Sequence, residues 1–465
     1  MRDDQLGGVA ENKMGVQPIA PLLLGMALPM MAGMLVQALY NVVDSIFVSH
    51  LSEAALTAVS LAFPVQNLMI AVSVGTGVGV NAIVSKSLGE KDFDQADRTA
   101  NTGLFLALCS TGLFMLFGLL FTGVFFRGQT SDPDIVTYGI HYTFIVCVFS
   151  QGLFVQIMME KLLSSTGKTV YSMLLQLAGA ALNLVLDPIL IFGLFGFPAL
   201  GVTGAALATV IGQWLAAGLG VWFNATRNHE LHFHLRSIRP NGTAVRRIYA
   251  IAVPGIAMQS VGSLMVFGMN KILLAFTSTA AAVFGVYFKL QSFIFMPVFG
   301  LNNGMVPIVS YNFGAHKPKR MTATIGLSMG LATGIMLVGF ALFQLVPAWL
   351  LGLFDASPEM LRLGVPALRI ISVSFLLAGV NIVASAVFQS LGRGMYSLWM
   401  SLGRQLVALL PIAWLLSLAG DVDLVWLAFP ASELVATTLS MLFLRRVYRQ
   451  SIRPMYEAPG AAIDG

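Results

Sequence analysis

The feature that most constrains this chain is a series of apolar segments, each long enough to cross a lipid bilayer. Of the 465 residues, 57% are hydrophobic and only 10% are charged, whereas a soluble domain carries about 25% charged residues. An α-helix needs roughly 20 residues to span the hydrocarbon core, and segments of this kind recur from residue 18 to residue 446. The sequence therefore predicts an all-α integral membrane protein.

We expect twelve transmembrane helices, the first near residues 18–42 and the last near 423–446. Basic residues concentrate in every second loop, and this set includes Lys86, Lys161, Lys168, Arg393 and Arg404. The opposite loops carry only Arg127 and Arg362. Basic loops stay in the cytoplasm, so we expect a multi-pass protein of the plasma (inner) membrane with both termini cytoplasmic. The net charge of +5 is explained by these loops, and no nucleic-acid partner is expected.

The two halves of the sequence repeat each other at a constant offset of 225 residues. Phe63, Gln66, Gly75, Gly79 and Gly89 match Phe288, Gln291, Gly300, Gly304 and Gly314 in turn. Each half contains six expected helices in the same order, so the halves form a parallel repeat about an axis along the membrane normal. Two pseudo-symmetric six-helix lobes around a central cleft are typical of a transporter.

The repeat divides the chain into five predicted regions. They are a cytoplasmic N-terminal tail (1–17), a first lobe (18–223), a cytoplasmic loop between the lobes (224–246), a second lobe (247–446) and a cytoplasmic C-terminal tail (447–465).

Two carboxylates fall in or beside membrane helices, where charge is costly and mostly faces the protein interior. Asp44 follows the first apolar segment in YNVVDSIFVSH, and the helix could already have ended there. Asp187 lies inside ALNLVLDPILIFG, with Asn183 one helical turn earlier. Pro188 frees a backbone carbonyl upstream. We predict a site for a proton or Na⁺ at Asp44, Asp187 and Asn183, with a structural kink as the alternative for Asp187.

Other polar side chains have two interpretations each. Glu160 ends the fourth helix beside Lys161, so it could join the cation site or form an ion pair at the cytoplasmic interface. Lys289 could contact substrate or form a structural salt bridge, for example with Glu433. The side chains that we expect to line a substrate cleft are Tyr40, Gln66, Lys289, Gln291, Asn302 and Asn303.

Five stretches taken together resemble the multidrug and toxic compound extrusion (MATE) family over nearly the whole chain. They are VDSIFVSHL (43–51), SKSLGEKDFDQA (85–96), ALNLVLDPILIFG (181–193), GVTGAALATVIGQ (201–213) and MPVFGLNNGMVPIVSYNFGA (296–315). The details resemble most the bacterial branch with the DNA-damage-inducible and staphylococcal-type multidrug exporters.

The resemblance implies two six-helix lobes forming a V, and antiport of drugs against H⁺ or Na⁺. It implies acidic residues at the positions of Asp44 and Asp187, with Asn183 in the same network, Thr209 as a further member and a polar group near Glu160. Some family members also carry cation-binding carboxylates in helices 7 and 10. This sequence has none there, so we do not expect a Na⁺ site in the second lobe.

We therefore predict a secondary multidrug antiporter, and not an enzyme, that exports lipophilic and cationic drugs. The sequence contains no Walker motif, so we expect no ATP and no cofactor apart from the coupling ion, H⁺ or Na⁺. Expected partners are organic cations and membrane lipids, and we expect a monomer. Two alternatives stay open: a flippase for lipid-linked precursors or polysaccharide of the same superfamily, and a membrane binding or sensor protein that does not transport.

Overall fold

The structure is a computed structural model that describes residues 11–232 and 241–457, and within these ranges it is all-helical. Ten of the described helices are long and apolar enough to cross a membrane, and two bent helix pairs bring the total to twelve. The predicted fold class is confirmed by this count. The first bent pair turns by 45° and the second by 52°.

The spans of the first half are α2 (Ile19–Ser49), α3 (Glu53–Gly89), α4 (Phe93–Leu120), the bent pair α6 (Pro133–Val148) and α7 (Gln151–Ser165), α8 (Thr169–Phe192) and α9 (Val202–Arg227). Those of the second half are α10 (Gly242–Leu274), α11 (Ser278–Gly314), α12 (Pro318–Leu345), the bent pair α14 (Pro358–Ser372) and α15 (Phe375–Ser390), α16 (Gly394–Leu402) continued by the π-helical η4 (Gly403–Leu409) and α17 (Leu410–Ser417), and α19 (Ala428–Val447). Short elements between and beside the spans are α1 (Lys13–Val16), α5 (Thr122–Arg127), η2 (Leu194–Gly196), α13 (Pro347–Gly352), α18 (Val422–Val425), η5 (Tyr448–Ile452) and α20 (Arg453–Glu457).

Several helices extend beyond the ends that the sequence predicts. The first helix continues to Ser49 instead of ending near residue 42, because SIFV extends its apolar run. Helices α9 and α10 reach into the predicted loop 224–246, and helix also forms within both predicted tails. Residues 1–10, 233–240 and 458–465, which complete those three regions, lie outside the described residues. The cytoplasmic location of the three regions stays a prediction.

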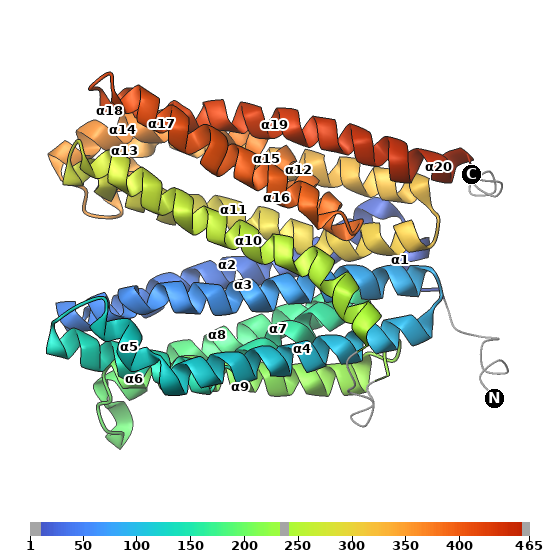
Figure 1. Cartoon of the computed structure of the whole chain (residues 1–465), viewed down its shortest axis with the longest axis horizontal. Helices are drawn as coiled ribbons and strands as arrows, with labels where there is room; N and C mark the ends of the chain where they lie inside the picture. The colour runs from blue at the N-terminus through green and yellow to red at the C-terminus, as the bar shows by residue number, and fades with distance from the viewer. Residues whose placement is uncertain (1–10, 233–240, 458–465) are drawn as a thin grey trace.

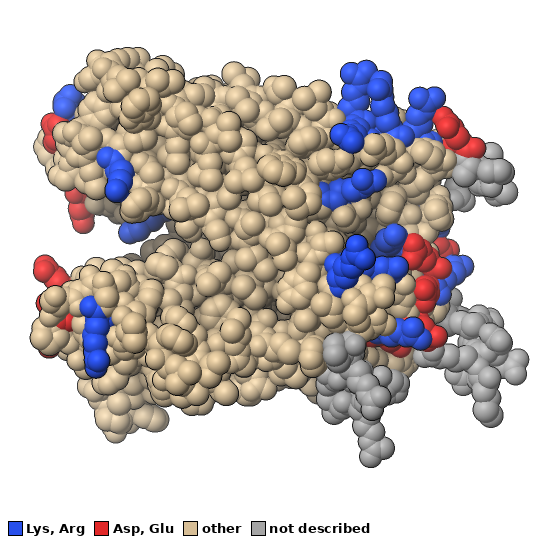
Figure 2. Space-filling model, in the orientation of Figure 1, with Lys and Arg blue, Asp and Glu red and all other residues tan. Residues whose placement is uncertain are grey.

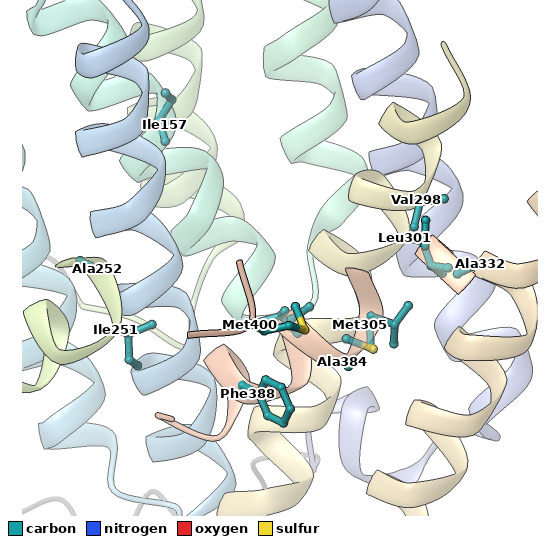
Figure 3. Packing of buried hydrophobic residues seen from close by; sticks show 14 of the residues in the cluster. Ile157, Ile251, Ala252, Val298, Leu301, Met305, Ala332, Ala384, Phe388 and Met400 are labelled. Atoms are coloured by element: carbon teal, nitrogen blue, oxygen red, sulfur yellow. The ribbon is translucent and has the colours of Figure 1, made fainter. Parts of the chain in front are cut away.

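The helices form two layers that Figure 1 shows one above the other, with α3–α9 in the lower layer and α11–α20 in the upper layer, while α10 runs obliquely from the upper layer to the lower one. Helices α2 and α3 pack against α11 and α10 across the boundary. Buried apolar side chains from both halves form one continuous core, part of which Figure 3 shows around Ile157, Ala252 and Met305. At the end away from the chain termini, the surface is hollowed between the two layers (Figure 2).

The 225-residue repeat extends to individual hydrogen bonds. Ser85 Oγ donates to the Ser165 carbonyl at 2.9 Å, and Ser310 Oγ donates to the Ser390 carbonyl at 2.9 Å. The second helix of each half begins with a hydroxyl cap: Ser52 accepts from the Ala55 N–H and Thr277 from the Ala280 N–H, each at 3.0 Å. Such a cap satisfies a backbone donor that the helix leaves unpaired. The repeat is therefore a repeat of structure as well as of sequence.

Helices α3 and α11 cross each other closely at the end of the molecule that carries the termini. A Cβ atom on Gly89 would overlap the Tyr311 carbonyl oxygen, and one on Gly314 would overlap the Lys86 carbonyl oxygen. Only glycine allows two backbones to approach this closely. The two glycines therefore hold the halves together at this end.

A short N-terminal segment, residues 11–17, also joins the halves at this end. Its Asn12 amide donates to the Thr166 carbonyl of the first lobe at 3.3 Å, and to both carboxylate oxygens of Glu230, just after α9, at 2.9 and 2.7 Å. On the other side, Lys317 donates to Glu11 at 2.6 Å, and Arg320 donates to the Gln17 carbonyl at 2.6 Å. We call this segment the N-terminal strap, because it is hydrogen-bonded to both lobes.

Candidate functional site

The predicted aspartates lie together in the first lobe. Asp44 is inside α2 and Asp187 is inside α8, two helices that pack against each other. Their carboxyl groups are hydrogen-bond partners. A bond between two carboxyl groups requires a proton on one of them. The alternative that the helix ends before Asp44 is wrong, because α2 continues past it.

Asn183 and Thr209 complete one side of this pair. With its amide oriented to satisfy both atoms, Asn183 donates to Asp187 Oδ2 at 2.8 Å and accepts from the Thr209 backbone N–H at 2.9 Å. The Thr209 side chain on α9 is also a hydrogen-bond partner of Tyr40 on α2. Asp44 and Asp187 each keep one buried oxygen without a hydrogen-bond partner among the residues that the structure describes. These free lone pairs can accept from a ligand or bind a cation.

Tyr142 of α6 belongs to the same cluster and was not predicted. Its ring is buried, its hydroxyl accepts from Gln66 Nε2 at 3.0 Å, and it is close enough to Asp44 and Asp187 to feel their charge. No pattern in the sequence points to this role, because Tyr142 is far from both acids along the chain and lies in an apolar segment. We call Tyr40, Asp44, Tyr142, Asn183, Asp187 and Thr209, together with Gln66, the aspartate cluster.

Glu160 is not part of the aspartate cluster. It lies near the end of α7 that precedes α8, whereas Asp187 is near the far end of α8; at 1.5 Å per residue this separates them by about 20 Å along the helices. Glu160 instead pairs with Lys161 at 3.5 Å. Lys161 Nζ donates to Asn303 Oδ1 in the second lobe at 3.0 Å. The alternative of an ion pair is therefore the one that the geometry supports, and Asn303 contacts the first lobe.

The second lobe has a different buried network. Glu433 of α19 pairs with Arg404 at 3.2 Å and accepts from Asn381 Nδ2 at 2.8 Å. Asn381 also donates to Thr437 at 3.0 Å. The predicted salt bridge between Lys289 and Glu433 is wrong. Arg404, which the sequence placed in a loop, lies within a span. The π-helical η4 (Gly403–Leu409) begins one residue before Arg404; such segments change which side chains face a neighbouring helix.

The other predicted cleft residues are dispersed in the second lobe. Lys289 is exposed, with Nζ 5.8 Å from the centre of the Phe354 ring. Asn302 is buried and donates to the Ile382 carbonyl at 3.2 Å. Gln291 Oε1 and Asn302 Oδ1 are buried without a hydrogen-bond partner in the described part of the chain. The structure thus brings Tyr40 and Gln66 to the aspartate cluster, but not the four residues of the second lobe.

Comparison with proteins of known sequence gives full-length relatives. The multidrug export protein MepA of Staphylococcus haemolyticus (strain JCSC1435) is 26% identical over 446 residues, which cover 96% of each chain. The MepA protein of Staphylococcus aureus (strain MRSA252) is 23% identical over 95% of this chain and 96% of its own.

Comparison with solved structures confirms the fold. The structure described as the outward-facing conformation of a multidrug resistance MATE family transporter of the MOP superfamily has a TM-score of 0.90 at 24% identity, covering 97% of this chain and 99% of that one. A MOP superfamily transporter from Pyrococcus furiosus Vc1 (DSM3638), described by the reverse polarity of its binding pocket, has a TM-score of 0.89 at 24% identity, covering 97% of this chain and 99% of its own.

The family model MatE matches residues 29–189 and 249–415, one segment in each lobe. The two matched segments cover most of the chain, including Asp44 and Asp187. The chain therefore belongs to the MatE family of membrane transporters.

Proposed function

We propose that this chain is a secondary antiporter that exports lipophilic cationic drugs across the plasma membrane in exchange for protons. The observation that carries the proposal is the pair of hydrogen-bonded carboxyl groups on α2 and α8. No basic side chain of the described residues forms an ion pair with either aspartate. The pair is thus available to a coupling ion, and the full-length likeness to proteins named multidrug export proteins supports the choice of substrate.

A proton is the coupling ion that this geometry supports best. Two carboxyl groups in contact cannot both be ionised without strong repulsion, so such a pair holds one proton between them. Loss of that proton places two negative charges between α2 and α8 and favours their separation. Na⁺ is the alternative, because the same cluster offers carboxylate, amide and hydroxyl oxygens.

The orientation follows from the distribution of charge. Lys and Arg side chains gather at the end of the molecule that carries the termini (Figure 2), and such an end stays in the cytoplasm. The hollow between the lobes is at the other end (Figure 2), so it would face outward. The strap, the crossing of α3 with α11 and the contact from Lys161 to Asn303 would then close the cytoplasmic side.

In the proposed cycle, an outward-facing protein takes up a proton at Asp44 and Asp187 and releases its drug. The protein then opens to the cytoplasm, loses the proton and binds another drug. A carboxylate pair that has lost its proton carries two negative charges, so it attracts a cationic drug more strongly than a pair that has regained the proton. Proton binding and drug binding therefore oppose each other, and this links proton transport to drug transport without a direct contact between ion and drug.

The test is uptake of a fluorescent organic cation into proteoliposomes, driven either by a pH gradient or by a Na⁺ gradient. We expect the pH gradient to drive uptake, and Asp44→Asn and Asp187→Asn to abolish it. Asp132→Asn, at an exposed helix cap, is the matched control and keeps wild-type uptake. Uptake driven by the Na⁺ gradient alone would show that Na⁺, and not the proton, is the coupling ion. Uptake with neither gradient coupled would reject antiport and favour one of the two alternatives.

A further inference from the structure

A second cavity lies at the cytoplasmic end of the first lobe, at the opposite end of α8 from Asp187. Its volume is about 240 Å³, and it is lined by residues 166–171, Asn12, Lys13 and Glu230. Residues 166–168 form the turn from α7 into α8, and Asn12 and Lys13 belong to the N-terminal strap. The proposed transport cycle does not use this cavity.

Positive charge dominates the lining. Lys13 and Lys168 both face the cavity, and neither has a carboxylate within 4 Å among the described residues. Burial and the neighbouring Lys168 charge lower the pKa of Lys13. Two ammonium groups that repel each other in a half-buried space leave room for an anion that binds both.

The N-terminus of α8 adds donors to the same cavity. Lys168 is the N-cap of this 24-residue helix and makes no side-chain cap within the described chain. The first backbone N–H groups of a helix and its dipole attract anions. Thr169, the first residue of α8, is 1% exposed, lines the cavity, and has a hydroxyl oxygen with no hydrogen-bond partner in the described ranges. A buried hydroxyl without a partner is costly, and an anion would satisfy it.

One carboxylate, Glu230, limits the positive charge but does not cancel it. Both of its oxygens accept from the Asn12 amide, so it is held by the strap and not by a lysine. Burial raises the pKa of Glu230, and the charges of Lys168 and Lys13 oppose this shift. Two lysines against one carboxylate leave the cavity net positive.

We propose that this cavity binds a phosphate group, carried by a phospholipid headgroup or by a soluble phosphate. Phosphate oxygens match the donors present: two ammonium groups, a hydroxyl and the N–H groups of a helix N-terminus. Apolar surface next to the cavity suits a lipid as the source. Val170 is 48% exposed, and the Tyr171 ring packs on Phe223 with 4.9 Å between centroids; aromatic residues of this kind collect at the level of the headgroups.

The bound phosphate would also hold the two lobes together. Lys13 lies in the strap between Asn12, which is bound to the first lobe, and Met14, whose carbonyl accepts from Asn312 and Arg320 of the second lobe. Phosphate bound to Lys13 and Lys168 therefore fastens the strap to the first lobe, and it stabilises the conformation in which the cytoplasmic side is closed.

The experiment uses the purified full-length protein and two probes. Inorganic phosphate is titrated at constant ionic strength while thermal unfolding is followed, and retention of phosphatidylglycerol against phosphatidylcholine is measured by native mass spectrometry. We expect at least one probe to bind, with affinity reduced at least tenfold in Lys13→Gln/Lys168→Gln and about threefold in Thr169→Val. Phosphatidylglycerol alone would identify a headgroup, and inorganic phosphate alone a soluble ligand.

The matched control is Arg393→Gln. Arg393 occupies the position in the second lobe that Lys168 has in the first, at the N-cap of α16. The substitution therefore removes the same charge from the equivalent helix. Binding should be unchanged in this variant. The proposal is overturned if neither probe binds, or if Arg393→Gln weakens binding as much as the lysine double variant. Thr169→Val keeps the test decisive if the double variant does not fold.

Discussion

The two lobes have the same order of helices but differ in how they accommodate buried acidic side chains. In the first lobe, Asp44 and Asp187 are hydrogen-bonded to each other. In the second lobe, the buried Glu433 is neutralised by Arg404. Glu433 has a permanent basic partner, whereas two acids in contact need a proton or a cation between them. The ion coupling that we propose therefore uses the acids of the first lobe and not the paired Glu433 of the second lobe.

The packing at the end that carries the termini is repeated between the lobes. There the serine hydrogen bonds and the glycine crossing are repeated at an offset of 225 residues. The polar networks farther along the helices are not repeated. Packing at one end of the molecule is thus common to both lobes, while the chemistry near the hollow is specific to each.

The largest expected effect is the loss of transport when an acid of the first lobe is neutralised, compared with the same change in the second lobe. Asp187→Asn should reduce drug tolerance of cells to that of the empty vector, because the cluster can no longer exchange a proton. Glu433→Gln keeps the hydrogen bond from Asn381 and should retain most of the tolerance at equal expression. Loss of tolerance in both variants would show that both lobes take part in coupling.

The second prediction concerns the ion pair of the second lobe. Arg404→Met leaves the buried Glu433 carboxylate unpaired and should lower the free energy of unfolding by about 2–3 kcal/mol, below the full value for a buried pair because Arg404 is partly exposed. Arg404→Met/Glu433→Met should recover most of this loss. The measurement is the thermal unfolding midpoint in detergent. A double variant no more stable than the single one would contradict a simple charge effect.

The third prediction tests the symmetry of the crossing between α3 and α11. Gly89→Ala and Gly314→Ala should each cost about 1–3 kcal/mol, since the added methyl group overlaps a backbone carbonyl and forces the helices apart. Gly112→Ala on α4 is the control, because a Cβ there meets open space and the helix gains up to about 1 kcal/mol. Clearly unequal losses of stability at positions 89 and 314 would show that the two glycine contacts contribute unequally to the stability of the protein.

The smallest expected effect is at the repeated serine hydrogen bonds. Ser85→Ala and Ser310→Ala each remove one donor to a buried carbonyl and should each cost about 1 kcal/mol. If the two hydrogen bonds act independently across the crossing, the double variant should show the sum of the two losses. A double variant that deviates by more than about 0.5 kcal/mol would reveal coupling between the lobes through this region.

The sequence predicted the helices and the repeat because both depend on local pattern: long apolar runs, and Gly, Gln and Ser at a fixed spacing. It also pointed to Asp44 and Asp187, since charge within an apolar run is rare, and to Asn183 one helical turn before Asp187. That these three residues bind a coupling ion stays a prediction. It could not supply Tyr142 or Arg404, whose roles depend on which helix faces them. Glu160 was placed with the wrong partners because the distance along α8 that separates it from Asp187 appears only once the helices are built.

The crossing of α3 and α11 has a consequence for the history of the chain. Gly89 meets the backbone at Tyr311, Gly314 meets the backbone at Lys86, and both pairs are related by the same offset of 225 residues. A contact in which two copies of one surface meet each other is isologous, as in a two-fold homodimer. A half-length ancestor with this helix could therefore have dimerised through itself, with one codon supplying both glycines.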